Sequence, residues 1–476
     1  MALAGVLLPL AQLWAATPAG PGGAASASTP PMPAPPPSAG GSTVATGSAG
    51  LPAPIAAALA RARIAPEAAF VWVGPAAGGP ARLAHQAEQL ANPASVIKLV
   101  TAAVALDTLG PTYTWATTVH VDGSLKQGVL HGNLVLKGGG DARLVSERLW
   151  LLLQRVQQIG VREVTGDIVI DRSAFELPDI DPGVFDGERH RPYNVQPDAF
   201  IVNGKTVVLS FHPEPALGLA RIGAEPRLAG VDIPTSVPLV RADCGDWRSQ
   251  LQADFSQPGQ IRFGGRYALA CGDRNWPVAY GDPASYNARA VAALWRDLGG
   301  KLAGKVRDGR VAPGSAALLE FVSPTLAEVV RDMNKHSNNL IAQHLFLTLS
   351  LAQQGVGRYE ASRELMLARV RERAGCAADA LRIDKGSGLS RDERVTPVCL
   401  ARVLQARRAT GAAGRAHLKT GSLANVAALA GVVHGPDGRR QIVVAIINHP
   451  QAGSDEARAA LDAVLRWTLD DKDRQP

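Results

Sequence analysis

The chain has 476 residues, 46% of them hydrophobic, so it is long enough to bury a sizeable core and to form more than one domain. The net charge is +7, from 49 basic and 42 acidic residues. No run of lysine and arginine is interleaved with aromatic residues and no zinc-finger spacing occurs, so we expect no nucleic-acid partner. The ten histidines are scattered along the chain, and we expect neither a metal site nor a cofactor.

The N-terminal segment carries no charge before Arg61. Residues 1–16 hold an apolar run that ends in small residues and resembles a secretory signal peptide, although the usual basic flank is missing. This run is shorter than the about 20 residues that a membrane-spanning helix needs. Residues 17–54 are rich in Ala, Gly, Pro and Ser and predict a disordered linker. We therefore expect an exported protein whose mature chain has no transmembrane span.

The first ordered elements predict a small α/β unit. Phe70–Val73 is typical of a strand, a glycine-rich turn follows, and Arg82–His85 predicts a second short strand. A helix is expected from Asn92 to about Leu109. From residue 112 to about 283 the pattern changes to short β-like runs separated by turn residues, interrupted by one helix at Ser146–Gln158.

Helices return after residue 284, and three strands precede the last of them. The expected helices are Asn287–Leu298, Thr325–Lys335, Asn338–Ser350, Glu360–Ala374 and Asp455–Leu469. The expected strands are His417–Leu423, Ala427–Gly435 and Arg440–His449, with a turn at residues 436–438 between the last two. The simplest architecture is one α/β catalytic domain, residues 55–111 and 284–476, split by a β-rich insertion at residues 112–283.

Four cysteines occur, and none makes a Cys-x-x-Cys pair. An even number in an exported chain is typical of two disulfides. We expect Cys244 to pair with Cys271, and a loop of that size would contribute about 3 kcal/mol in the chain-entropy model. For Cys376 and Cys399, the sequence leaves open whether they form a disulfide or remain two buried thiols.

A serine and a lysine three residues apart, Ser95 and Lys98, stand near the start of the first long helix. Alone this is a weak pattern, because such serines are commonly caps and such lysines commonly extend to water. However, only ten of the 49 basic residues are lysine, and only Lys98 has a serine three residues before it. Lysine can lose its proton, which arginine cannot, and burial promotes that loss. The pair therefore predicts a nucleophilic serine with lysine as its base.

Two further motifs match this chemistry. Ser337 and Asn339 stand at a predicted helix start, and Lys419-Thr420-Gly421 is the only Lys-Thr-Gly in the chain. Each is weak alone, since Ser337 could merely cap a helix and Lys-Thr-Gly could end a surface strand. In this order, Ser-x-x-Lys, Ser-x-Asn and Lys-Thr-Gly form the signature of penicillin-binding proteins and serine β-lactamases.

The motifs suggest a role for each catalytic residue. Ser95 would attack the substrate, and Lys98 would take its proton, since apolar neighbours and the cation of Lys419 lower a lysine pKa. Ser337 would relay the proton to the leaving amine. Asn339 would hold the substrate amide and Lys98 in place.

The Lys-Thr-Gly strand would bind the substrate. Lys419, with the hydroxyls of Thr420 and Ser422, suits a carboxylate, and Gly421 leaves room for the substrate to lie along the strand as an extra edge. The backbone N–H groups of Ser95 and Ser422 would form the oxyanion hole.

Longer stretches resemble the D-alanyl-D-alanine carboxypeptidase/endopeptidase family, the low-molecular-mass penicillin-binding proteins with a large inserted domain. They lie between about Pro52 and Leu469 and read NPASVIKLVTAAVALDTLGPTYTW, LKGGGDARL, GDIVIDRSAF, RPYN, SPTLAEVVRDMNKHSNNLIAQHL, DKGSGLSRDERVTP and KTGSLANVAALAGVV. The chain departs from the family pattern at Asn338, Gln343 and Gly204-Lys205. None of these is a catalytic position, and the last leaves the detail of the insertion open.

This resemblance implies the fold, the reaction and the place where it occurs. The fold would be α/β (α+β): a penicillin-binding-protein-like antiparallel sheet flanked by helices and split by a β-rich insertion. The protein would be a periplasmic serine-type hydrolase that cleaves peptidoglycan stem peptides ending in D-Ala-D-Ala, and β-lactam antibiotics would acylate it.

Two other functions share these motifs. A serine β-lactamase would hydrolyse its acyl-enzyme quickly, but we find no clearly placed deacylating glutamate, and the insertion argues against it. A non-catalytic peptidoglycan-binding protein would have a decayed site, whereas all the motif residues are intact. A conventional Ser-His-Asp hydrolase is not expected, because the chain has no Gly-x-Ser-x-Gly.

Overall fold

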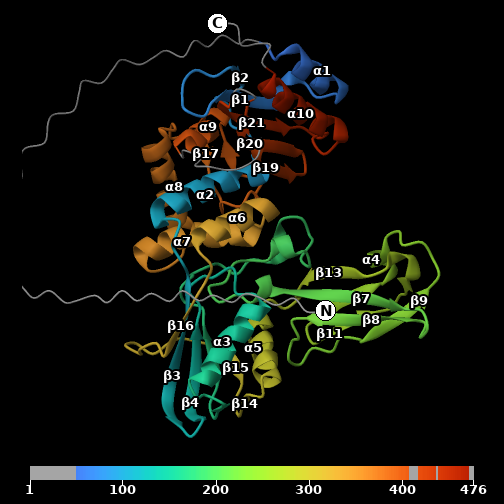
Figure 1. Cartoon of the computed structure of the whole chain (residues 1–476), viewed down its shortest axis with the longest axis vertical. Helices are drawn as coiled ribbons and strands as arrows, with labels where there is room; N and C mark the ends of the chain where they lie inside the picture. The colour runs from blue at the N-terminus through green and yellow to red at the C-terminus, as the bar shows by residue number, and fades with distance from the viewer. Residues whose placement is uncertain (1–49, 407–415, 436–437, 471–476) are drawn as a thin grey trace, which may run out of the picture. The chain divides into compact units, whose positions relative to one another are not determined.

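Strands from both ends of the chain form one antiparallel sheet in the computed structural model, which describes residues 50–406, 416–435 and 438–470. The strand order is β19-β20-β21-β1-β2, so β1 from the start of the chain pairs with β21 from its end (Figure 1). In that pair Trp72 lies opposite Val444. The strands are β1 (Ala69–Pro75), β2 (Leu83–His85), β19 (Ala416–Leu423), β20 (Val426–His434) and β21 (Arg440–Asn448).

Different helices cover the two faces of this sheet (Figure 1). Because side chains alternate along a strand, Val71 and Val73 of β1 lie in one core and Trp72 lies in the other. The first core is closed by α1 (Ala53–Arg61) and α10 (Asp455–Leu469). The opposite face carries α2 (Lys98–Leu109), α6 (Leu326–His336), α7 (Asn339–Gln354), α8 (Tyr359–Ala374) and α9 (Pro397–Ala406). The expected antiparallel sheet flanked by helices is confirmed.

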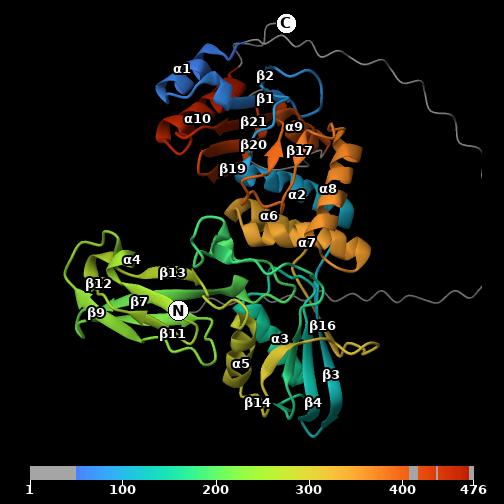
Figure 2. The same ribbon diagram turned by 180° about the vertical axis from the view of Figure 1, so that it is seen from behind.

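The middle of the chain adds a seven-stranded and a five-stranded sheet. They share one core with α3 (Ser146–Gln158) and α5 (Tyr286–Asp297), which lie side by side in Figure 2. The first sheet contains β3 (Ala116–Lys126), β4 (Val129–Lys137), β5 (Glu163–Val164), β6 (Ile168–Asp171), β14 (Lys301–Leu302), β15 (Val306–Gly309) and β16 (Leu319–Val322). The second contains β7 (Thr206–Glu214), β8 (Leu219–Glu225), β9 (Ser236–Val240), β12 (Tyr267–Ala268) and β13 (Arg274–Ala279). A helical turn, α4 (Trp247–Gln250), and a hairpin of β10 (Ala253–Gln257) and β11 (Gln260–Phe263) lie between β9 and β12 in the chain.

The inserted β-rich part extends beyond the boundary that we expected at residue 283. After that residue, β14 pairs with β5, β15 with β6 and β16 with β3. Helix α5 buries Tyr286 and Trp295 in the same core. Since β16 ends at Val322, the expected start of the second catalytic segment at residue 284 is too early. The sequence did not reveal this, because these strands are very short and their partners lie more than 130 residues earlier.

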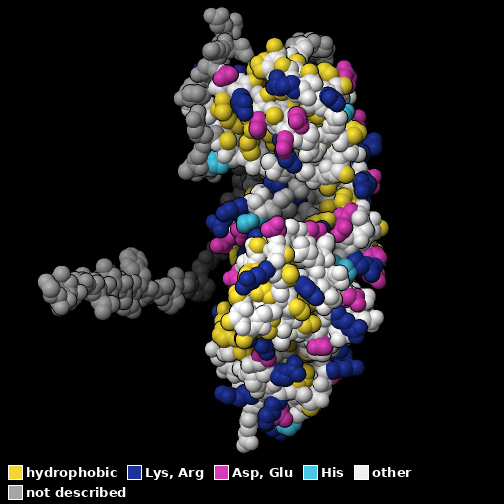
Figure 3. Space-filling view, turned by 90° about the vertical axis from the view of Figure 1, so that its right-hand side faces the viewer, with side chains coloured by type: hydrophobic (Ala, Val, Ile, Leu, Met, Phe, Trp, Pro, Cys, Tyr) yellow, Lys and Arg dark blue, Asp and Glu magenta, His cyan; other side chains and the backbone are white. Residues whose placement is uncertain are grey.

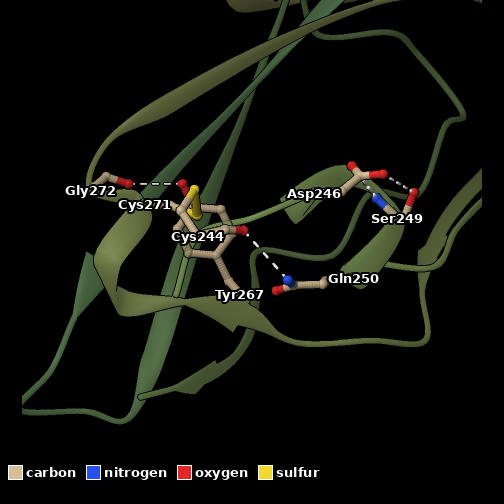
Figure 4. Close-up of a disulfide and its surroundings, with 7 residues drawn as sticks. All are labelled: Cys244, Asp246, Ser249, Gln250, Tyr267, Cys271 and Gly272. Atoms are coloured by element: carbon tan, nitrogen blue, oxygen red, sulfur yellow. Dashed lines mark hydrogen bonds between the residues drawn. A yellow bond between two sulfur atoms is a disulfide. The ribbon is translucent and has the colours of Figure 1, made fainter. Parts of the chain in front are cut away.

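Both cysteine pairs form disulfides, Cys244–Cys271 and Cys376–Cys399. The first closes a loop of the five-stranded sheet, next to Tyr267, whose hydroxyl donates to the Gly272 carbonyl at 2.8 Å (Figure 4). The second joins Cys376, which follows the Gly375 cap of α8, to Cys399 in helix α9. The pairing that the sequence left open is thus a disulfide.

Most expected elements are confirmed, with some differences at their ends. The helices at residues 146–158 and 455–469 agree at both ends. Helix α1 begins at Ala53, so the expected linker ends too late; its composition of Ala and Pro hides the apolar face that it buries. Helix α9 was not expected. The expected signal peptide, most of the linker, and two residues of the turn at 436–438 lie outside the described residues.

The described surface shows mixed charge. On the face drawn in Figure 3, basic, acidic and apolar side chains are interspersed. Within the described ranges no helix is both long and apolar enough to cross a bilayer. In the same ranges, no group of three His, Cys, Asp or Glu side chains is arranged to hold a metal ion.

Candidate active site

Ser95 lies in a short 3-10 helix, η2 (Ala94–Ile97), that leads directly into α2. The α-helix expected from Asn92 is therefore wrong in its first turn, where Asn92 makes side-chain bonds instead. Its Oδ1 accepts from the Ala94 N–H at 2.9 Å. Its backbone N–H and C=O bond to the side chain of Asn448 at the end of β21, at 2.8 and 3.0 Å. These bonds fix the serine-bearing turn to the sheet.

Lys98 is fully buried, yet its amine is surrounded by polar atoms. Nζ lies 2.9 Å from Ser95 Oγ and 2.7 Å from Asn339 Oδ1, and it also donates to the Ser387 carbonyl oxygen. Burial and then the positive charge of Lys419 lower the pKa of Lys98 to about 7, and the negative charge of Glu393 opposes this change. A substantial fraction of Lys98 is thus neutral near pH 7, where it can accept the hydroxyl proton of Ser95.

Ser337 and Asn339 lie at the junction of two helices. Ser337 ends α6 in the left-handed conformation, with φ of 53°. Asn338 then caps α7, since its Oδ1 accepts from the Ile341 N–H at 2.9 Å. Asn339 is therefore the first residue of α7, and it bonds to Lys98 through Oδ1 and to the Tyr193 carbonyl through Nδ2 at 3.3 Å.

Strand β19 brings the third motif to the other side of the site. The Lys419 Nζ donates to Ser337 Oγ at 2.8 Å and to the Thr420 carbonyl at 2.5 Å. Burial lowers the pKa of Lys419 to about 8. The strand alternation leaves the side chains of Thr420 and Ser422 exposed, whereas Lys419 and Gly421 are buried. The exposed hydroxyls are available to a ligand that lies along the strand.

Two glycines let other backbone segments approach the serine turn. A Cβ atom on Gly421 would lie 2.7 Å from the Pro93 carbonyl oxygen and 2.8 Å from the Ser95 nitrogen. A Cβ atom on Gly388 would lie 2.2 Å from the Ala94 carbonyl oxygen and 2.7 Å from the Ser95 nitrogen. The turn is thus held between β19 and the loop from β17 (Leu381–Arg382) to β18 (Arg394–Val395).

The structure therefore brings the eight predicted residues together from three parts of the chain. Hydrogen bonds join Ser95, Lys98 and Asn339 in one group and Ser337 with Lys419 in another. Gly421 touches the serine turn through its backbone, with Thr420 and Ser422 beside it on the strand.

Sequence reasoning missed the loop that carries Ser387, Gly388 and Glu393. Ser387 accepts a hydrogen bond from Lys98, and Glu393 is buried and lies close enough to Lys98 to influence its charge. The segment DKGSGLSRDERVTP was noticed for its resemblance, but none of its residues was singled out. A carboxylate in such a charged run usually faces water, so its burial comes only from the tertiary fold.

Comparisons with known proteins identify the family and several relatives of the chain. The profile of the D-Ala-D-Ala carboxypeptidase 3 (S13) family matches residues 51–410 and 405–468. D-alanyl-D-alanine carboxypeptidase DacB of Haemophilus influenzae is 23% identical over 66% of this chain and 65% of that protein. A D-alanyl-D-alanine carboxypeptidase of Actinomadura sp. is 26% identical over 76% of this chain and 74% of its own.

A solved structure shares the fold. The crystal structure of penicillin binding protein 4 (dacB) from Haemophilus influenzae is similar with a TM-score of 0.68 and 22% identity, over 84% of this chain and 94% of that one. A second structure of that protein, complexed with a novel β-lactam, has a TM-score of 0.64, the same identity and the same coverage.

Proposed function

Since the chain belongs to the D-Ala-D-Ala carboxypeptidase 3 (S13) family and is a hydrolase, we propose that it cleaves peptidoglycan stem peptides and cross-links through an acyl-enzyme on Ser95. It acts after export to the periplasm, as a carboxypeptidase on stem peptides ending in D-Ala-D-Ala and as an endopeptidase on cross-links. The observation that carries the proposal is the buried Lys98 amine 2.9 Å from the Ser95 hydroxyl, with its pKa lowered to about 7.

Acylation begins with the loss of the Ser95 proton. Neutral Lys98 accepts this proton, and Ser95 Oγ attacks the carbonyl carbon of the penultimate D-Ala. The backbone N–H groups of Ser95 and Ser422 stabilise the oxyanion, as donors aimed at the developing charge. When the tetrahedral intermediate collapses, the C–N bond breaks and the proton passes through Ser337 to the leaving amine of the terminal D-Ala. Water then hydrolyses the ester and restores Ser95.

Substrate recognition uses the exposed side of β19. The side chains of Thr420 and Ser422 are exposed, and Lys419, the residue before Thr420, donates to Ser337 Oγ. A terminal carboxylate is the group that this set of donors suits, and it is present in both D-Ala-D-Ala and penicillin. Asn339 holds Lys98 through Oδ1 and offers its amide to the substrate.

The decisive experiment is the intact mass after a short incubation with benzylpenicillin, with Ser95→Ala as the control. We expect a one-to-one adduct that maps to Ser95 and persists, and no adduct in the variant. Rapid loss of the drug without a lasting adduct would identify a serine β-lactamase. No adduct and no loss of drug would refute the catalytic proposal and leave a peptidoglycan-binding role, which a pull-down with isolated cell-wall sacculi would test.

A further inference from the structure

Glu393 is a buried carboxylate that the proposed mechanism does not use. Its side chain is 0% exposed. One oxygen accepts from the backbone N–H groups of Gly386 at 2.7 Å and Lys385 at 3.2 Å, and the other accepts from Gly388 at 2.8 Å. Both oxygens thus bind donors of the loop at residues 385–388. Buried charges are rare in proteins unless such partners stabilise them.

This loop contacts the nucleophile helix, formed by η2 and α2, at three points. The Ser387 carbonyl accepts from Lys98 Nζ. The Gly386 carbonyl accepts from Thr101 Oγ1, one turn further along α2, at 2.6 Å. Gly388 lies so close to the backbone of Ala94 and Ser95 that no Cβ atom fits. Glu393 therefore binds two of the three residues that touch the helix, Gly386 and Gly388, and the third, Ser387, lies between them.

Charges around the amine reinforce this link. Lys419 of β19 and Glu393 are the charged groups that act on Lys98, with opposite effects on its pKa. The negative charge of Asp384, the residue before this loop, raises the pKa of Glu393. Burial raises the pKa of the Glu393 carboxyl, and the three N–H donors favour its charged form and offset part of that rise. With both oxygens accepting from N–H groups, the ionised form is the one that fits the loop.

We propose that Glu393 is a positioning residue of the acylation step, which holds the loop at residues 385–388 against the nucleophile helix and so fixes Lys98 toward Ser95. The inference rests on the proposed function and adds a residue to it. Glu393 acts through the backbone of Gly386 and Gly388 and through its charge. It does not touch the substrate.

Two variants distinguish the effect of the length of the Glu393 side chain from the effect of its charge. Glu393→Gln keeps the size but removes the charge, and it turns an N–H donor toward at least one loop N–H. Losing a hydrogen bond to a charged group should slow acylation by benzylpenicillin about tenfold or more. The rising limb of its pH profile should also move to lower pH, because the charge that raises the Lys98 pKa is gone. Glu393→Asp keeps the charge but shortens the reach, so the rate should fall while the limb stays in place.

Two further variants serve as controls. Glu88→Gln changes an exposed glutamate and should alter neither quantity. Thr101→Val removes the hydroxyl that binds the Gly386 carbonyl without changing any charge. It should slow acylation about three- to tenfold and leave the pH limb unmoved, as expected for one neutral hydrogen bond. It also tests the loop contact if Glu393→Gln does not fold.

The rates are measured by stopped-flow acylation at pH 5 to 9 and expressed per folded molecule, with near-ultraviolet circular dichroism as the measure of folding. Slower acylation with a shifted limb in Glu393→Gln, and without a shift in Glu393→Asp, would establish the positioning role. The proposal would be overturned if the folded Glu393 variants were acylated at the wild-type rate with an unchanged pH profile. A wild-type rate in Thr101→Val would also overturn it. Either result would count against the proposal even if the variants were less stable than the wild type. A wild-type protein that benzylpenicillin does not acylate would instead overturn the proposed function, and this inference with it.

Discussion

Gly421 offers a sharp test of how closely the active site is packed. A Cβ atom there would lie 2.7 Å from the Pro93 carbonyl oxygen, 2.8 Å from the Ser95 nitrogen and 3.0 Å from the Val96 nitrogen. Ordinary contacts begin near 3.4 Å, and all three neighbours are backbone atoms that cannot rotate away. In Gly421→Ala the strand and the serine turn must therefore separate by about 0.7 Å.

The cost of that movement should fall mainly on the reaction. A displacement near 1 Å in a catalytic site can cost about 100-fold in rate, and overpacking costs about 1–3 kcal/mol of stability. We expect acylation by benzylpenicillin to slow by about two orders of magnitude, with a moderate fall in melting temperature. Both are measured on the same preparation, by stopped flow and by calorimetry.

Gly453→Ala is the matched control. Nothing lies within 4 Å of a Cβ atom at that position, and neither glycine has a positive φ, so the two variants differ in whether the added methyl group has space. If Gly421→Ala were acylated as fast as the wild type with an unchanged melting temperature, the close approach of β19 to Ser95 would be wrong.

Three further predictions follow from the charges and disulfides. The acylation rate should rise with pH through about 7, as Lys98 loses its proton. It should fall above about 8, as Lys419 loses the charge that binds a carboxylate. A flat profile from pH 5 to 9 would exclude Lys98 as the base. Lys419→Gln should move the rising limb to higher pH, since the cation that lowers the Lys98 pKa is removed, and it should also raise KM for substrates with a free carboxylate. Replacing Cys244 and Cys271 by Ser should lower the free energy of unfolding by about 3 kcal/mol in chemical denaturation without changing acylation, and a slower acylation would show that the five-stranded sheet supports the site.

The sequence predicted the parts of the fold that local patterns determine. Helix α10 has a Ser454 cap, acidic residues in its first turn and a regular apolar face, so both of its ends could be predicted. The strands β14 to β16 have two to four residues each and gain their stability from partners far away in the chain. No local pattern marks such pairings, which is why the end of the insertion was misplaced.

The same distinction holds for the site. Ser95, Lys98, Ser337 and Lys419 could be predicted because the chemistry requires those residue types at those spacings. Glu393 could not, because a glutamate between Asp392 and Arg394 has the sequence context of a solvated loop. The position of Ser95 in a 3-10 turn also depends on Asn448, more than 350 residues later, whose side chain holds Asn92.

The pairing of β1 with β21 has a consequence for how the protein is made. The partner of β1 lies about 365 residues later in the chain, close to the C-terminus. At about 5–20 residues per second, the ribosome needs roughly 20–70 s to complete that interval. During this time the apolar strand Phe-Val-Trp-Val has no neighbour on that edge and is open to aggregation. Folding of the sheet must wait for the last strand, as is typical of topologies with high contact order. A chain that lacks β21 therefore cannot complete this sheet, and it also lacks Asn448, whose side chain holds Asn92 beside the serine turn.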